Sequence, residues 1–88
     1  MLEKDVSLSI GQRIRRERIY LCLSQAELAE MVKTSTSSIQ RWENDKTLPH
    51  LYHRKQLCTA FGKRVEEIFS YLIEDEYAMR NHPHRPTA

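Results

Sequence analysis

Residues 24–46, SQAELAEMVKTSTSSIQRWENDK, carry the signals that decide the fold of this 88-residue chain. Ser24 is followed three residues later by Glu27, which is the spacing of a capping box. In that arrangement the serine side chain accepts from the glutamate amide, and the glutamate side chain accepts from the serine amide. Ser35 is a good N-cap for a second helix. The stretch therefore predicts two short helices joined by a tight connection.

Each predicted helix has one apolar side, and the second also has a distinctive polar side. Leu28, Ala29 and Val32 give the first helix a narrow stripe suited to burial, and Ile39 and Trp42 lie one turn apart on the second. The outer face of the second helix is small, polar and partly basic, and consists of Thr36, Ser37, Gln40, Arg41 and Asn44. This is the pattern of a helix-turn-helix, whose second helix lies in the major groove of duplex DNA.

The outer face of the second helix suits the edges of base pairs. Small side chains at its start let the backbone approach closely. Arg41 can reach O6 and N7 of a guanine, Gln40 can pair bidentately with an adenine, and the methyl group of Thr36 can meet that of a thymine. We therefore expect base contacts from Ser35, Thr36, Ser37, Gln40 and Arg41.

The same stretch resembles the phage-repressor, or Cro-like, helix-turn-helix family, also called the xenobiotic-response-element family. The resemblance covers roughly residues 8–73, and the matching residues are Gln25, Ala29, Ile39, Trp42, Glu43 and Asn44. It implies an all-α fold: a compact five-helix lambda-repressor-like DNA-binding domain with the helix-turn-helix at its second and third helices. Its structural residues would be Arg18, Glu43, Ala29, Ile39 and Trp42, of which Arg18 and Glu43 match a buried salt-bridge pair.

Contacts to DNA phosphate are expected from the resemblance and from position. The resemblance implies that Gln25 and Asn44 contact phosphate and that Thr36, Ser37 and Arg41 face the bases. Arg13 lies near the start of a helix that crosses the DNA backbone in this fold, and the residues after the second helix form a loop that can follow the backbone. The full set expected to contact phosphate is Arg13, Ser24, Gln25, Asn44, Lys46, Thr47 and His50.

Two residues depart from the family pattern. The family usually has glycine in the turn, where this chain has Lys33, and after the Glu-Asn pair, where it has Asp45. Lysine is sterically costly at positive φ, whereas aspartate tolerates that conformation better. We therefore expect a slightly strained or differently shaped turn.

The rest of the chain is expected to complete the domain. Residues 1–8 are a leader, 9–76 the domain and 77–88 a disordered tail. The first helix is predicted over 9–22, with Ile10, Ile14 and Leu21 inside and Arg13 and Glu17 among its outer residues. A fourth helix over 50–61 has Leu51, Leu57, Cys58 and Phe61 on its core side and Arg54 outside. Gly62 ends that helix, and a fifth helix begins near Val65.

Composition limits the function. The hydrophobic content of 40% supports one small domain, and no apolar run is long enough to cross a membrane. MLEKDVSLSI is no signal peptide, so a cytoplasmic protein is expected. Cys22 and Cys58 are read as small buried apolar groups, with a disulfide between them as the lesser alternative.

The charge is unevenly distributed. Residues 1–64 hold twelve Lys and Arg against seven Asp and Glu, and residues 65–88 hold two against five, for a net charge of +2. The basic segment, residues 1–64, suits contact with DNA phosphate and leaves the acidic segment, residues 65–88, free for partners. Ordinary solvated surface charge explains the same distribution.

No catalytic constellation, cofactor motif or metal site is evident. His50 and His53 are three residues apart but lack further ligands, so we read them as surface histidines. We expect not an enzyme but a sequence-specific double-stranded DNA-binding regulator of the repressor type, acting as a homodimer on an inverted-repeat site. The alternatives are the N-terminal module of a larger signalling protein, or an antitoxin, acting mainly through a protein partner.

Overall fold

The computed structural model describes residues 8–69, and in that range the protein is built from helices. The complete ones are α2 (Ile10–Tyr20), α3 (Gln25–Met31), α4 (Thr36–Glu43) and α5 (Leu51–Phe61). A fifth helical segment begins at Val65 and continues to Phe69, the last described residue. The expected all-α, five-helix architecture is confirmed. The predicted tail over 77–88 lies outside the described residues.

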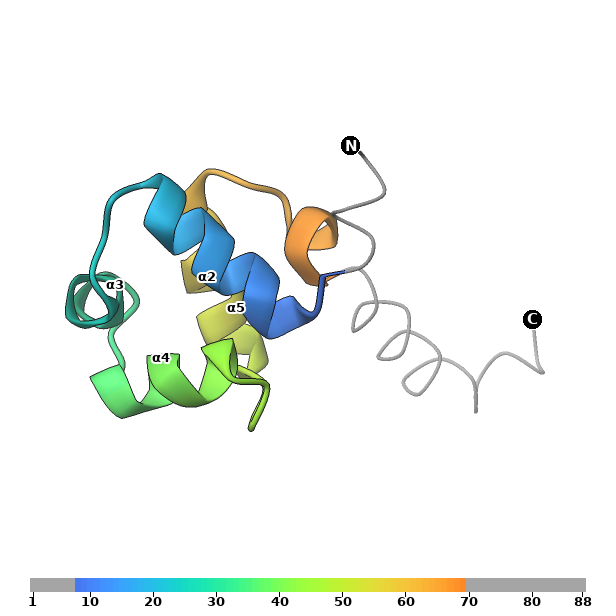
Figure 1. Ribbon diagram of the computed structural model, residues 1–88. Helices are drawn as coiled ribbons and strands as arrows, with labels where there is room; N and C mark the ends of the chain where they lie inside the picture. The colour runs from blue at the N-terminus through green and yellow to red at the C-terminus, as the bar shows by residue number, and fades with distance from the viewer. Residues whose placement is uncertain (1–7, 70–88) are drawn as a thin grey trace, which may run out of the picture.

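Figure 1 shows how the helices are arranged. α2 crosses above α4 and α5, α3 is seen end-on at one side, and α4 runs along the lower edge of the molecule. Both α2 and α3 pack against α4. No described helix has the length and apolar character needed to cross a membrane.

Local hydrogen bonds start the first three helices where the sequence predicts. The Ser24 Oγ accepts from the Glu27 amide at 3.0 Å, and the Ser24 amide donates to the Glu27 Oε1 at 2.8 Å, which completes the predicted capping box. Ser35 Oγ accepts from the Ser38 amide at 3.1 Å. Ser9 forms a second capping box with Gln12 at the start of α2. Short-range capping therefore sets where each of these helices begins.

The core lies between α2, α3, α4 and α5 and is closed by the last helical segment. Ile14, Leu28, Ile39 and Leu57 are fully buried, and Phe69 joins them from the end of the described chain. Trp42 is also in this cluster. The apolar sides predicted for the two helices of the motif are thus the sides that face the core.

Several predictions about which side of a helix faces the core were wrong. Leu21 and Leu51 are 41% and 49% exposed, because Leu21 is the C-cap residue of α2 and Leu51 is the first residue of α5. Arg54, expected outside, is buried, and its Nε donates to the carbonyl of Pro49 at 2.9 Å. Glu17, also expected outside, is buried. Long charged side chains can lie along a core when their polar ends find partners.

The two cysteines differ in environment, contrary to the expectation that both are buried. Cys58 is buried in the core and Cys22 is exposed, and both are free thiols. Cys22 follows the end of α2 with φ of 60°, which turns the chain toward α3. The buried position of Cys58, with a smaller effect of the charges of Glu67 and Glu66, raises the pKa of its thiol to about 11.

The start of α2 lies unusually close to the end of α4. A Cβ atom added to Gly11 would lie 2.4 Å from the carbonyl oxygen of Trp42 and 2.7 Å from that of Glu43. The carboxylate of Asp45 spans the same junction, since it accepts from the Gly11 amide at 2.9 Å and from the Ser9 hydroxyl at 2.7 Å. These contacts hold the C-terminal end of α4 against the N-terminal end of α2.

Candidate nucleic-acid interface

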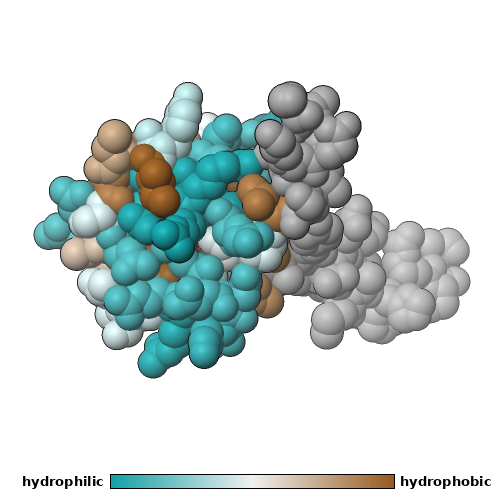
Figure 2. All heavy atoms as spheres, viewed as in Figure 1, coloured by the Kyte–Doolittle hydropathy of each residue, from teal (hydrophilic) through white to brown (hydrophobic). Residues whose placement is uncertain are grey.

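α4 presents its polar row outward because its apolar side is held in the core. Ile39, Trp42 and Glu43 are buried, and the polar row lies on the opposite side of the helix. The exposed members of the row are Ser35, Ser37, Gln40, Arg41 and Asn44, and Thr36 is half-buried. In Figure 2 the lower part of the molecule, where α4 runs, is covered by hydrophilic side chains. The structure thus brings together on one surface every residue expected to contact bases.

The turns on either side of α4 both use positive φ. Lys33 has φ of 61° and Asp45 has φ of 58°, at the two positions where glycine is usual in the family pattern. The amide of Thr34 donates to the carbonyl of Ala29 at 2.9 Å and so closes the end of α3. Lys33 therefore adopts a conformation that is strained for a side chain of its size, while Asp45 gains the contacts to α2 described above.

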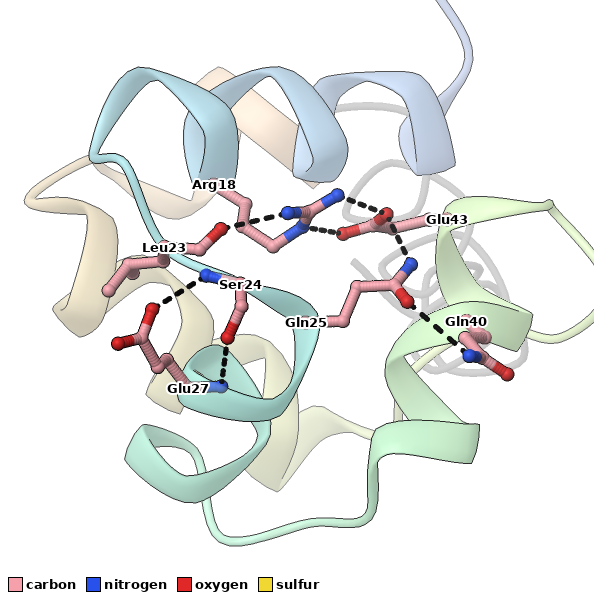
Figure 3. A network of polar contacts seen from close by, with 7 residues as sticks. All are labelled: Arg18, Leu23, Ser24, Gln25, Glu27, Gln40 and Glu43. Atoms are coloured by element: carbon pink, nitrogen blue, oxygen red, sulfur yellow. Dashed lines mark hydrogen bonds and ion pairs between the residues drawn. The ribbon is translucent and has the colours of Figure 1, made fainter.

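A chain of polar contacts joins α2, α3 and α4 beneath the exposed row (Figure 3). Arg18 donates to both carboxylate oxygens of Glu43, from Nε at 2.6 Å and from Nη2 at 3.1 Å, and its Nη1 donates to the carbonyl of Leu23 at 2.8 Å. The side chains are 12% and 3% exposed. The expected pairing of Arg18 with Glu43 is thus present, and it connects α4 to α2 and to the start of α3.

Gln25 extends this chain to the surface. Its Nε2 donates to the Glu43 Oε1 at 3.0 Å, and its Oε1 accepts from Nε2 of Gln40 at 3.4 Å. The side-chain amide expected to contact phosphate is therefore engaged by two groups of α4. A phosphate contact by Gln25 stays a prediction, and the structure gives the residue a second set of partners.

The other residues expected at phosphate lie at the surface, with one exception. Ser24, Asn44, Lys46, Thr47 and His50 are all exposed. Arg13 is not at the surface: it is 6% exposed, and its Nη1 donates to the carbonyl of Ile68 at 3.3 Å. The expectation of an outward, phosphate-binding Arg13 is corrected, because this side chain connects α2 to the last helical segment.

One of the two histidines also differs from expectation. His50 is exposed at the N-cap of α5, but His53 is half-buried, with its ring centroid 5.2 Å from that of Trp42 and 5.2 Å from that of Tyr52. His53 therefore packs beside the tryptophan that anchors α4. Within residues 8–69, no group of three or more His, Cys, Asp and Glu side chains is arranged to hold a metal ion.

Comparison with known proteins agrees with this geometry. A family model described as helix-turn-helix matches residues 14–68. The chain belongs to the helix-turn-helix family. Among solved structures, the P22 c2 repressor protein, crystallised with a synthetic operator in the presence of Tl⁺, is similar with a TM-score of 0.68. The two chains are 31% identical, over 70% of this chain and 94% of the repressor chain. The predicted resemblance to phage-repressor-like domains is confirmed.

In helix-turn-helix terms, α3 and α4 are the two helices of the motif and α4 is the outer, second one. Sequence reasoning missed two features that position it: the contact of Asp45 with the start of α2, and the link from Gln25 to Gln40. A glycine at position 11, early in a predicted helix, was the available signal for a close approach of two backbones. Nothing local in the sequence signals the pairing of Gln25 with Gln40.

Proposed function

We propose that this helix-turn-helix protein is a DNA-binding transcription regulator that places α4 in the major groove of duplex DNA. The observation that carries the proposal is the outer row of α4. Its side chains are small and polar at the N-terminal end and include Gln40 and Arg41 one turn further on. A helix that reads bases presents its first residues to their edges. The similarity to a repressor crystallised with an operator supports the same role.

Within this proposal each set of residues has a role. Ser35, Thr36 and Ser37 allow close approach, and Gln40 and Arg41 read base edges through hydrogen bonds. Around α4, exposed groups contact the backbone and set the position of the helix without reading sequence. The proposed phosphate-contacting residues are the exposed Ser24, Asn44, Lys46, Thr47 and His50, together with the half-buried Gln25.

We further propose that the regulator is of the repressor type and acts as a homodimer. Dimers of this kind bind two half-sites about 34 Å apart, so the operator mirrors the two-fold symmetry of the protein. A regulator of this kind must be in the compartment that contains its DNA, which agrees with the expected cytoplasmic location.

The proposal is tested by selecting duplexes from a random pool with the 88-residue chain at physiological salt. We expect an inverted repeat whose half-sites are about one helical turn apart. An Arg41→Ala, Gln40→Ala double variant is the matched control and should recover no common sequence. Recovery of only salt-sensitive, sequence-independent binding by the unaltered chain would overturn the proposal.

We propose the outer face of α2 as the contact between the two copies of the homodimer, and one observation favours it. Ile19 and Tyr20 are 53% and 82% exposed on the outer face of α2, where they border a groove that also includes Arg15 and Arg16. An Ile19→Ser, Tyr20→Ser double variant should sediment as a smaller species if a second copy covers this face. Unchanged sedimentation of the variant would exclude α2 from the dimer contact.

A further inference from the structure

We propose that Asp45 is a positioning residue: its hydrogen bonds to the start of α2 hold the loop after α4 where Lys46 reaches DNA phosphate. This inference rests on the proposed DNA-binding function, because it concerns how one phosphate contact of that function is made. The loop, residues 44–47, carries three of the proposed phosphate contacts, Asn44, Lys46 and Thr47. Asp45 lies among them but carries the wrong charge to bind phosphate itself.

The first step is to ask what holds the loop. The amides of Asp45 and Lys46 donate to carbonyl oxygens of α4, at 3.1 Å and 2.9 Å. Because both bonds are made to α4 itself, they end that helix without fixing the loop against another element. Residues 44–48 are exposed, and burial of the chain resumes at Pro49. Core packing therefore does not hold the loop in place.

The second step is the contact of Asp45 with α2, at the end of the domain where α4 finishes (Figure 1). One carboxylate oxygen accepts from the Gly11 amide at 2.9 Å, and the other accepts from the Ser9 hydroxyl at 2.7 Å. The N-terminal end of a helix also favours a nearby negative charge. Gly11 permits this approach, because an added Cβ would lie 2.7 Å from Oδ1 of Asp45. The loop is thus bound to a second helix through one side chain.

The third step is the direction of the Asp45 charge. Both oxygens accept from donors at the start of α2, so the carboxylate faces that helix and is not left free beside the proposed phosphate contacts. Glycine, which is usual at this position in the family pattern, could adopt the φ of 58° but could make neither bond. The link to α2 is therefore made by a side chain in which this chain departs from the family pattern.

The test compares two variants that remove the same charge but differ in their hydrogen bonds. In Asp45→Asn the amide oxygen can still accept from the Gly11 amide, and the amide nitrogen can donate to the Ser9 hydroxyl oxygen. Asparagine also tolerates positive φ. Asp45→Gly relieves the backbone strain but removes both bonds. A difference in DNA affinity between the two variants therefore reports the bonds to α2 and not the lost negative charge.

Affinity is measured at several salt concentrations on the duplex that the unaltered chain selects from a random pool. We expect Asp45→Asn to bind at least as tightly as the unaltered chain, because it keeps the link and loses a charge that repels phosphate. Asp45→Gly should bind about fivefold more weakly than Asp45→Asn at physiological salt, with a slope of log K against log salt less steep by about one, as for one lost phosphate contact. Base preference should be the same in both variants, because phosphate contacts carry no sequence information.

A double-mutant cycle links the effect to Lys46. Asp45→Asn and Asp45→Gly are each combined with Lys46→Ala and measured on the same duplex. The difference in affinity between the two Asp45 variants should shrink in this background, because the contact in which they differ has already been removed. A purely structural role of Asp45 would leave that difference unchanged, since lost stability does not depend on the Lys46 side chain.

Melting curves check that the variants are folded, and Ser9→Gly is the second variant if Asp45→Gly is not. Glycine is nearly as good an N-cap as serine but lacks the hydroxyl that donates to Asp45, so Ser9→Gly should also weaken binding.

Two outcomes would overturn the inference. Asp45→Asn and Asp45→Gly could bind with equal affinity and equal salt slope, which is the result if only the charge of Asp45 matters. Their difference could also persist in full in the Lys46→Ala background. In both cases the unaltered chain still selects a common site, whereas failure of the proposed function leaves no common site.

Discussion

Glu43 receives hydrogen bonds from two helices at once: Arg18 of α2 donates to both of its oxygens, and Gln25 of α3 donates to one of them at 3.0 Å. The carboxylate lies at the end of α4, so these bonds set how α4 stands relative to the rest of the domain. The position of the proposed DNA-reading helix thus depends on a buried ion pair, and that dependence can be measured.

Removal of Arg18 should destabilise the fold. In Arg18→Met the Glu43 carboxylate stays buried without its cationic partner, and loss of one member of a buried pair costs about 3–5 kcal/mol. Chemical denaturation measures the loss, and the exposed Arg15→Met is the control, expected within about 0.5 kcal/mol of the unaltered protein. An Arg18→Met, Glu43→Met double variant should recover part of the loss. Equal stability of Arg18→Met and Arg15→Met would contradict the structural role.

A side chain at position 11 should force α2 and α4 apart. The Cβ of Gly11→Ala would lie 2.4 Å from the Trp42 carbonyl, which is backbone and cannot move freely. We expect a loss of about 1–3 kcal/mol, typical of overpacking, measured by thermal unfolding. The control is Gly62→Ala, where no atom is within 4 Å and only the φ of 67° is unfavourable, so its cost should be about 1 kcal/mol. A smaller loss for position 11 than for position 62 would contradict the close approach.

Relief of strain in the turn before α4 should stabilise the protein. Lys33 has φ of 61° and an exposed side chain, so Lys33→Gly removes a steric penalty without uncovering the core. The gain should be about 0.5–1 kcal/mol after the greater flexibility of glycine in the unfolded chain is subtracted. Lys46→Gly is the control, because Lys46 is also exposed but does not have positive φ. This variant should bring no gain in stability. Destabilisation by Lys33→Gly in denaturant titrations would show that the lysine side chain makes a favourable contact.

Arg41 and Lys46 should differ in what they contribute to DNA binding. Arg41→Ala should cost about 1–3 kcal/mol on the preferred site and relax selection at one base pair. Lys46→Ala should weaken binding to all duplexes alike. It should also make the slope of log K against log salt less steep by about one, as expected for the loss of one phosphate contact. Titrations of a duplex panel at several salt concentrations distinguish the two. Equal losses on every sequence from both variants would remove Arg41 from the base-reading set.

The two thiols should react at different rates. A thiol reagent at pH 8 should modify the exposed Cys22 and leave the buried Cys58 unmodified until the protein is denatured. Burial holds the pKa of Cys58 at about 11 in the fold against an ordinary value of 9.0. Deprotonation therefore favours the unfolded chain, and stability should fall as the pH rises through that interval. Cys58→Ala should remove this part of the pH dependence, and an unchanged profile would contradict the burial effect.

The sequence by itself determined the features that act over three or four residues. Ser24 with Glu27, and Ser35 with its helix, fix helix starts because the capping partners are neighbours in the chain. Ile39 and Trp42 fix the buried side of α4 because the helical period places them on one face. The outer polar row, and with it the proposed function, could be predicted for the same reason.

Only the tertiary structure decided which distant residues meet. Gln25 and Gln40 are separated by 15 residues, Arg18 and Glu43 by 25, and Ser9 and Asp45 by 36. Of these contacts, only the pairing of Arg18 with Glu43 was predicted, through the family resemblance. The others depend on the angles at which α2, α3 and α4 cross. The last helical segment likewise covers Arg13, whose Nη1 donates to the carbonyl of Ile68, because a long side chain faces core or solvent according to the neighbouring helices and not according to its own sequence.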